Sequence, residues 1–375
     1  MKVLLTGGGS GGHFYPLIAI AEELARIAKE ERLIPPQVFF MAPEPYDARL
    51  LFENSIEFIP VATGKLRQYA LRKNITDIFR TAWGIMLALW KIFALYPDVV
   101  VGKGGFGSFP ALFAARLLRI PVIIHESDSV PGRVNKWAGR FARRIAVSFA
   151  EAGKYFPEGK VAHTGNPMRK ELFAQDARAG NEFFSLESDA PVILVLGGSL
   201  GAVALNETVL AALSELLPRY QVIHQTGRAN LADLVARAGV KLENHPQRSR
   251  FHPSSYLSVQ ELARAASVAS LIISRAGSTI FEIAAWGKPA ILVPITESNG
   301  DHQRGNAYNY ARTGAASVIE ETNLRPAILM AEIEKILGNP ARAEEMYRAA
   351  RAFAKTDAAE VIARAILELA LRHER

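Results

Sequence analysis

The fold of this chain is decided by the stretch KVLLT at residues 2–6, which runs directly into GGGSGGH at residues 7–13. The first five residues are typical of a buried strand, and the glycines after them allow a tight turn and a close approach of the backbone to a ligand. A helical pattern then begins near Pro16. A strand, a glycine turn and a helix form a phosphate-binding unit, because the helix begins with unpaired N–H groups and a partial positive charge.

The same pattern returns about half a chain later, where VILVL at 192–196 leads into GGSLGA at 197–202. Further strands are predicted at 38–41, 98–102, 121–125 and 144–148, and at 222–224, 271–274 and 290–294. Strands that alternate with helical patterns are typical of parallel sheets with crossover helices. The sequence therefore predicts an α/β protein with two doubly wound, Rossmann-like domains, residues 1–165 and 166–357, facing a central cleft. We expect the last apolar helix, about residues 358–375, to pack back on the first domain.

Length and composition narrow the possible functions. The 375 residues exceed one ordinary core, and the absence of cysteine excludes thiolate nucleophiles and Cys-based metal sites. A net charge of +7 indicates an anionic partner, which could be nucleic acid, a phosphorylated small molecule or an acidic membrane surface. Because no zinc finger, aromatic RNA-binding motif or long Lys/Arg run occurs, we expect no nucleic-acid partner.

Residues 74–96 form a helical pattern with one wide apolar face. That face consists of Ile75, Ile78, Phe79, Ala82, Trp83, Met86, Trp90 and Phe93. Asp77, Arg80 and Lys91 interrupt the pattern, which argues against a membrane span of about 20 mostly apolar residues. Two interpretations remain open: a crossover helix buried in the first domain, or a helix that lies in a membrane interface.

The first glycine loop matches the dinucleotide fingerprint G-x-G-x-x-G through Gly7, Gly9 and Gly12. That fingerprint requires an acidic residue about 20 residues further on, and the first candidate, Glu44, comes too late and follows a proline. A nicotinamide-dependent oxidoreductase is therefore disfavoured. His13 stands where the loop becomes a helix, and there it could accept a proton from a hydroxyl near neutral pH or simply hydrogen-bond the loop.

The second half contains a further strand–turn–helix pattern, RAGSTIFE at 275–282. Glu282 would lie in the first helical turn, where its carboxylate could accept both hydroxyls of a ribose or could complete a capping box. The polar cluster DHQRGN at 301–306 follows an apolar run, and loops at the carboxyl ends of strands are where open α/β sheets bind ligands. No Asp-x-Asp motif occurs in a plausible loop, so we expect neither a metal nor a cofactor.

These motifs, taken in order, resemble the MurG family of bacterial glycosyltransferases, glycosyltransferase family 28. The matching stretches are TGGGSGGH (6–13), GKGGFGS (102–108), HE (125–126), NKW (135–137), TGNPMR (164–169), LGGSLGA (196–202), RAGSTIFE (275–282), GKPA (287–290) and DHQ (301–303). The resemblance implies the GT-B fold and an inverting hexosyltransferase. Such an enzyme moves N-acetylglucosamine from UDP-N-acetylglucosamine to undecaprenyl-diphosphate-linked N-acetylmuramoyl-pentapeptide (lipid I), giving lipid II for peptidoglycan synthesis. It also implies a peripheral protein on the cytoplasmic side of the cell membrane, bound to the inner leaflet through residues 75–93 and nearby Lys and Arg.

The resemblance also implies a site for UDP-N-acetylglucosamine. Its residues would be Ser10, Gly11, Gly12, Asp128, Arg169, Ser199, Val259, Ser278, Thr279, Ile280, Phe281, Glu282 and Gln303. Arg169 and Ser199 would contact the diphosphate, and Val259 stands where the family makes a backbone contact to the uracil. Glu282 would hold the ribose, and Gln303 would hold the sugar hydroxyls.

On the acceptor side, the resemblance implies Gly104 and Gly105, with His13 as the general base and Glu126 as the alternative base. Two features depart from the family pattern. Asp128 takes the place of an amide side chain, and the segment 275–282 is one residue shorter than usual.

Three alternative functions would each leave different features in the sequence. A related enzyme with a different lipid acceptor, such as diacylglycerol, would share the donor motifs, whereas the loop at 104–106 and the His125-Glu126 pair favour lipid I. Sugar-nucleotide epimerases share the fold, but their arrangement of acidic residues and histidines is not found. A non-enzymatic scaffold would have no need for two complementary phosphate loops.

Overall fold

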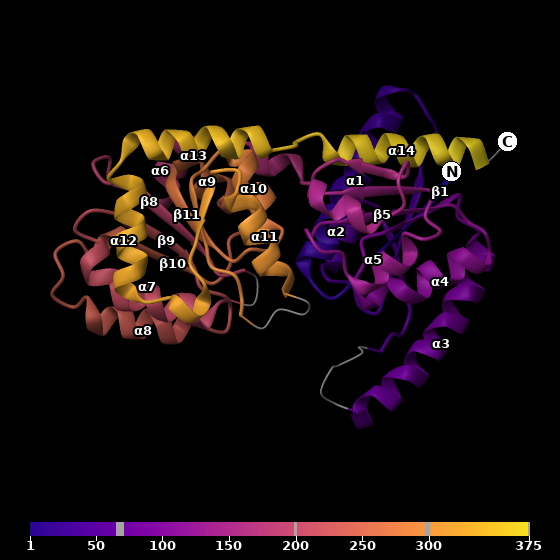
Figure 1. Ribbon diagram of the computed structural model, residues 1–375, viewed down its shortest axis with the longest axis horizontal. Helices are drawn as coiled ribbons and strands as arrows, with labels where there is room; N and C mark the ends of the chain where they lie inside the picture. The colour runs from indigo at the N-terminus through magenta and orange to yellow at the C-terminus, as the bar shows by residue number, and fades with distance from the viewer. Residues whose placement is uncertain (65–70, 199–200, 297–300, 374–375) are drawn as a thin grey trace. The chain divides into compact units, whose positions relative to one another are not determined.

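The computed structural model describes residues 1–64, 71–198, 201–296 and 301–373, with the backbone alone for residues 71–76, 372 and 373. The chain forms two compact units. Unit 1 contains Met1–Arg169 and Lys355–Arg375, and unit 2 contains Lys170–Ala354. Each unit is a parallel sheet covered by helices (Figure 1).

Unit 1 holds a sheet with the strand order β3-β2-β1-β4-β5-β6-β7, and its neighbouring strands pair in parallel. Its strands are β1 (Lys2–Thr6), β2 (Gln37–Ala42), β3 (Glu57–Pro60), β4 (Val99–Gly102), β5 (Val122–Glu126), β6 (Arg144–Val147) and β7 (Val161–His163). Its helices are α1 (Gly11–Glu30), α2 (Ala48–Glu53), α3 (Leu71–Leu95), η1 (Phe106–Ser108), α4 (Phe109–Leu117), α5 (Arg133–Ala138), η2 (Ala150–Tyr155) and α14 (Ala358–His373).

Unit 2 holds a second parallel sheet, with the order β10-β9-β8-β11-β12-β13. Its strands are β8 (Val192–Leu196), β9 (Gln221–Gln225), β10 (Phe251–Ser254), β11 (Ala269–Ser274), β12 (Ala290–Leu292) and β13 (Ala316–Val318). Its helices are η3 (Lys170–Phe173), α6 (Ala177–Phe184), α7 (Val203–Leu216), α8 (Leu231–Lys241), η4 (Arg248–Arg250), α9 (Val259–Val268), α10 (Thr279–Trp286), α11 (His302–Ala311), η6 (Glu321–Asn323), α12 (Pro326–Leu337) and α13 (Pro340–Phe353). The prediction of an α/β protein with two doubly wound sheets is confirmed.

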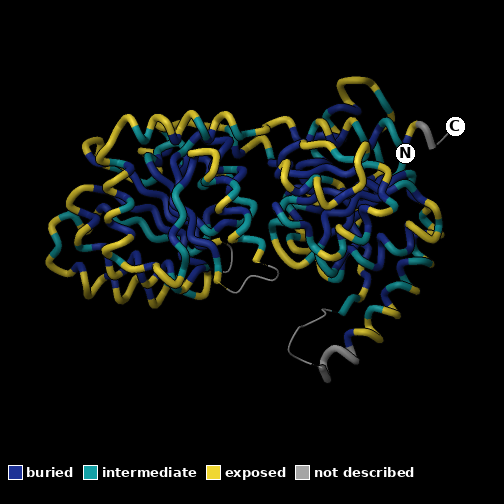
Figure 2. Tube along the Cα trace, viewed as in Figure 1, coloured by how far each residue is buried: buried dark blue, intermediate teal, exposed yellow. Residues whose placement is uncertain are grey.

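The core of unit 1 has two layers, one on each face of the sheet. Because successive side chains of a strand point to opposite faces, Val3 and Leu5 pack against α1 and α14, whereas Leu4 packs in the layer that contains α3 and α4. Both layers are dark in the burial view, and the exposed residues lie on the outer sides of the helices (Figure 2). The C-terminal helix α14 lies along α1 and completes one of these layers.

Helix α3 is only partly covered by unit 1. A narrow stripe of Asp77, Gly84, Ala88 and Ile92 is buried, and Gly84 lies so close to the carbonyl oxygen of Ala62 that no larger residue would fit. The wide apolar face is exposed: Ile78, Phe79, Trp83, Met86, Trp90 and Phe93 are 57–72% accessible. The interpretation as a buried crossover helix is therefore wrong for this face; the side chain of Ile75 lies outside the described residues. Among the described residues, Asp77–Leu95 is also the one segment whose length and composition could cross a membrane, by those criteria alone.

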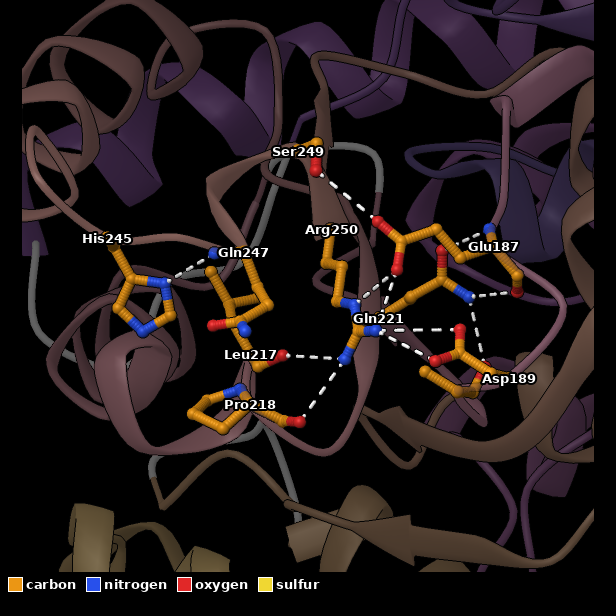
Figure 3. Close-up of polar contacts among 10 residues, drawn as sticks. Glu187, Asp189, Leu217, Pro218, Gln221, His245, Gln247, Ser249 and Arg250 are labelled. Carbon is orange, nitrogen blue, oxygen red and sulfur yellow. Dashed lines mark hydrogen bonds and ion pairs between the residues drawn. The ribbon is translucent and has the colours of Figure 1, made fainter.

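In unit 2, the guanidinium of Arg250 joins two chain segments, one before β8 and one before β9 (Figure 3). Its Nε donates to the Glu187 carboxylate at 2.7 Å, and its Nη1 donates to the carbonyl oxygens of Leu217 and Pro218 at 3.3 and 3.2 Å. Asp189 accepts from Nη2 at 3.3 Å. The Arg250 side chain is 10% exposed, so these donors are largely shielded from water.

Replacing Arg250 by Met should lower the free energy of unfolding by about 1–3 kcal/mol, because the shielded carbonyl oxygens of Leu217 and Pro218 lose their donor without gaining water. Chemical denaturation measures the change. Arg237→Met is the control, since Arg237 pairs with Glu207 and Asp233 on the open surface and its loss should matter little. Equal losses in the two variants would contradict a joining role for Arg250.

Candidate functional site

In each sheet, successive strands are added first on one side of the starting strand and then on the other. The change of side occurs between β1 and β4 in unit 1 and between β8 and β11 in unit 2. Loops that follow neighbouring parallel strands meet at the same edge of the sheet, and ligands of open α/β sheets bind there. In unit 1 these are the loops after β1, β4 and β5, and in unit 2 the loops after β8, β11 and β12. The residues predicted for the site lie mainly on these loops and on the helices that follow them.

The glycine loop after β1 positions His13 in unit 1. Ser10 precedes α1 as its N-cap, and its Oγ lies 3.0 Å from Nδ1 of His13 in the first helical turn. The other edge of the imidazole faces Gly105, where a Cβ atom would lie 3.5 Å from Nε2. The structure thus brings His13 together with the loop after β4, as the sequence predicts for the acceptor side.

The loop after β4 requires glycine for two reasons: its backbone conformation, and the close approach of neighbouring atoms. Gly104 and Gly105 have φ values of 83° and 77°, which side chains rarely adopt. A Cβ at Gly105 would lie 2.6 Å from the carbonyl oxygen of Gly8, and one at Gly104 would lie 2.8 Å from the amide of Asn135. The loops after β1 and β4 are therefore in contact, and Asn135 of α5 packs against the loop after β4.

Glu126 is the last residue of β5 and is buried. Its Oε1 accepts from the backbone N–H of Asp128 at 2.9 Å, and its Oε2 accepts from Gly132 N–H at 3.1 Å and from Nδ2 of Asn135 at 2.9 Å. These bonds stabilise the carboxylate form. Burial is the larger effect and raises the pKa of Glu126, and the charge of Asp128 raises it further. Glu126 thus holds the loop 128–132 in place.

Lys103 and Asn135 are the site residues that sequence reasoning missed. Lys103 follows β4 directly and is 1% exposed, and its Nζ has no hydrogen-bond partner among the described residues. Burial lowers the pKa of Lys103 to about 8, while the charges of Glu126 and Asp128 oppose that shift. Burial and the charge of Lys103 also hold the pKa of neighbouring His125 well below its usual value. The signal for Lys103 was a charged residue between a buried strand and two glycines.

Arg169, the last residue of unit 1 before the chain enters unit 2, packs on a ring of α1. Its guanidinium carbon lies 4.6 Å from the ring centroid of Tyr15. Tyr15 in turn closes over Gly11, where a Cβ would lie 2.9 Å from the ring. The structure therefore places Arg169 beside Tyr15 of α1, whose ring covers the predicted Gly11.

In unit 2, the loop after β8 approaches the segment after β9 closely. Gly201 has a φ of 80°, and a Cβ there would collide with the carbonyl oxygen of Thr226 and the amide of Asn230. Asn206 in the first turn of α7 donates to the same Thr226 carbonyl at 2.8 Å. Ser199, which was predicted to contact the diphosphate, lies outside the described residues.

The turn after β11 leads into α10, and the turn and the first turn of the helix carry five predicted residues. Ser278 is the N-cap, without a side-chain capping bond, and Thr279 begins the helix. The side chains of Ile280 and Phe281 are buried in unit 2, so only their backbone lies toward the turn. Glu282 is partly exposed and lies one residue beyond the position that a capping box uses. The geometry therefore disfavours the capping interpretation of Glu282.

The capping box lies instead at α9, where Ser258 and Glu261 exchange both bonds. Val259 is the first residue of that helix. Two residues before Val259, the N–H of Leu257 donates to the side-chain oxygen of Gln225 at 3.1 Å. Gln225 ends β9, so this bond holds the start of α9 at the edge of the sheet where β8 and β9 end.

The loops after β11, β12 and β13 are joined by polar side chains. Nη1 of Arg275 donates to the Val293 carbonyl at 3.1 Å, and Nη2 pairs with Glu321. Gln303, in the first turn of α11, accepts from the N–H of Ile295 at 3.2 Å, and Asn306 donates to the Ala276 carbonyl at 3.2 Å. Gln303 is thus brought to the same edge as Glu282. No group of His, Cys, Asp and Glu in the described part of the chain could hold a metal ion.

Comparison with known proteins covers both halves of the chain. Residues 3–147 match the glycosyltransferase family 28 N-terminal domain, and residues 192–362 match its C-terminal domain. A relative from Bacillus cereus, named UDP-N-acetylglucosamine--N-acetylmuramyl-(pentapeptide) pyrophosphoryl-undecaprenol N-acetylglucosamine transferase 2, is 38% identical over 352 residues. That match covers 93% of this chain and 94% of the relative.

One solved structure agrees with this assignment, and a second shows the fold alone. The crystal structure of MurG from Acinetobacter baumannii has a TM-score of 0.74 at 27% identity, covering 98% of this chain and 99% of that one. A UDP-GlcNAc 2-epimerase from Neisseria meningitidis, bound to UDP-GlcNAc, shares the fold with a TM-score of 0.69 at 15% identity, covering 98% and 100%. With the loops of both sheets arranged as described and close relatives matched almost end to end, the chain belongs to the MurG family of glycosyltransferase family 28.

Proposed function

We propose that this protein transfers N-acetylglucosamine from UDP-N-acetylglucosamine to lipid I, with inversion at the anomeric carbon, and so forms lipid II for peptidoglycan synthesis. The observation that carries the proposal is the match to relatives of that name over 93% of the chain. The two phosphate-binding edges support it, because donor and acceptor each contain a diphosphate.

Unit 2 supplies the donor site in this proposal. Glu282 holds the ribose hydroxyls, Gln303 the sugar hydroxyls, and the start of α9 at Val259 the uracil. Main-chain N–H groups at the beginnings of α7 and α10 face the diphosphate, with Ser199, Ser278 and Thr279 as side-chain donors and the backbone of Ile280 and Phe281 completing the turn. A helix N-terminus stabilises the charge that develops on the departing diphosphate. Arg169, the unit 1 residue at which the chain enters unit 2, is proposed to add a charge-assisted contact.

Unit 1 supplies the acceptor side. His13 accepts the proton of the attacking hydroxyl, because its ring is oriented by Ser10 and faces the Gly104–Gly105 loop. Glu126 is the less suitable base, since its two carboxylate oxygens already accept three hydrogen bonds from Asp128, Gly132 and Asn135. We assign Glu126 to holding the loop, and Ser10, Gly11, Gly12 and Asp128 to the same edge.

The exposed face of α3 is proposed to lie in the cytoplasmic leaflet of the cell membrane. Large apolar side chains gathered on one helix face are typical of a membrane or partner surface, and the two Trp suit an interface. Charge supports a membrane: unit 1 has 26 Lys and Arg against 18 Asp and Glu, a net +8, whereas unit 2 has 18 against 19, a net −1. An anionic leaflet attracts the basic unit.

A matched pair of variants tests the two sides of the reaction. His13→Ala should lower kcat roughly 10²- to 10⁴-fold with little effect on UDP-N-acetylglucosamine binding, because it removes proton transfer. Glu282→Ala should instead weaken donor binding roughly ten- to hundredfold, because charged hydrogen bonds to the ribose are lost. Radiolabel transfer to a short-chain lipid I analogue and calorimetric titration measure the two effects.

Exposed Glu243→Ala in unit 2 is the control and should match the wild type. Full activity of His13→Ala would remove His13 as the base. Binding of NADH without binding of UDP-N-acetylglucosamine would overturn the proposed function.

The membrane proposal predicts that the double variant Trp83→Glu/Trp90→Glu binds anionic liposomes with an affinity about tenfold below that of the wild type, or lower still. The reason is that two negative charges replace the interfacial rings. Phe52→Glu is the matched control: Phe52 is 85% exposed on α2, outside the apolar face of α3. Co-sedimentation of both variants, with circular dichroism to establish folding, measures the effect. Unchanged binding of a folded double variant would exclude α3 as the anchor.

A further inference from the structure

Lys103 is a buried charge that the proposed function leaves unexplained. It follows β4 directly, and its Cβ lies under the glycine loop, 3.2 Å from where a Cβ of Gly7 would be. The side chain is buried, and its Nζ has no hydrogen-bond partner among the described residues. An ammonium in such a place is strongly unfavourable unless opposite charges compensate for its lost hydration.

Two carboxylates supply that compensation. Strands β4 and β5 pair in parallel with Gly102 opposite Ile124, so Lys103 leaves the sheet beside His125 and Glu126. Glu126 and Asp128 both act on the Lys103 charge favourably. The two carboxylates also repel each other, because the hydrogen bond from the N–H of Asp128 to Glu126 holds the two acidic residues close together.

The remaining groups around Glu126 add little charge. His125 is buried and held neutral, its Nε2 lying 3.1 Å from the Gly165 carbonyl and from the Ser148 hydroxyl. Asn135 on α5 is an uncharged amide. His13 on α1 faces Gly105 on the other side of the loop. After burial, the largest influences on the charge state of Glu126 are therefore the charges of Asp128 and Lys103.

We infer that Lys103 is a positioning residue whose buried ammonium offsets the Glu126 and Asp128 carboxylates and keeps Glu126 ionised on the N–H groups that shape the acceptor-side loop. Lys103 and Asp128 then act on each other through their opposite charges. The charge offset stands independently of the reaction, whereas its effect on acceptor activation rests on the proposed function.

The first test is the melting temperature of Asp128→Asn relative to wild type at pH 7 and pH 10. At pH 7 the substitution removes a partner of the Lys103 ammonium, but it also relieves repulsion of Glu126. The pKa of Lys103 is about 8, so at pH 10 the ammonium is gone and only the relief remains. Asp128→Asn should therefore gain stability relative to wild type from pH 7 to pH 10, by about 2–5 °C.

Two backgrounds make this test specific. The gain should vanish in Lys103→Met and persist in Lys136→Met, since Lys136 is an exposed lysine of the same unit. A gain of equal size in both backgrounds would overturn the inference. If Lys103→Met does not fold, the Asp128→Asn comparison decides alone, and no change between pH 7 and pH 10 overturns the inference.

The second test reads the positioning role through the pH profile of kcat/KM for transfer to a lipid I analogue. Protonation of Glu126 releases the loop and so adds a limb of its own on the acidic side of the profile, beside that of His13. Loss of the ammonium in Lys103→Met raises the pKa of Glu126, so the Glu126 limb should move to higher pH. Loss of the neighbouring carboxylate in Asp128→Asn should move it to lower pH. If this limb of the pH profile stayed at the wild-type pH in both variants, the positioning role would be contradicted. An inactive wild type would contradict the proposed function and leave the thermal result standing.

Discussion

Parallel strand pairing is the constraint on which the rest of this structure depends. A parallel strand can follow its neighbour only through a crossover, so every strand-to-helix turn falls at the same edge of its sheet. That rule brings the loop after β1 together with those after β4 and β5, although β1 ends at Thr6 and β4 at Gly102, and it does the same for β8, β11 and β12. Each helix that starts at this edge presents unpaired N–H groups there. Phosphate-binding geometry is thus a consequence of topology before any side chain is considered.

The central strands could be predicted from the sequence, whereas the edge strands could not. β1, β4, β8 and β11 are buried on both faces and therefore consist of continuous apolar runs. The unpredicted strands β3, β7, β10 and β13 are the four edges of the two sheets. An edge strand is covered on fewer sides, so it tolerates Pro60, His163 and Pro253, which break the apolar signal.

The candidate site was predictable where backbone conformation dictates the residue. Gly104 and Gly105 are fixed by positive φ and by contact with Gly8 and Asn135, and motif reasoning found both. Side-chain networks were less accessible. Nothing in the local sequence says that Asn135 reaches back to Glu126, or that the capping box belongs to Ser258 and Glu261 instead of Glu282. Such contacts depend on which elements pack together, and spacing along the chain does not encode that.

Helix α3 and Lys103 illustrate two ways in which a fold departs from the most stable arrangement. On α3, a buried stripe only one residue wide leaves a far wider apolar face to solvent, because Gly84 fixes the helix against the carbonyl of Ala62 and prevents it from rotating. At Lys103, a charge is enclosed where an apolar side chain would cost less. Sequences agree with their structure at every level except where function requires otherwise. Both departures lie in unit 1, one on its surface and one beneath its glycine loop, and unit 1 is the domain for which we propose contact with the lipid-linked diphosphate.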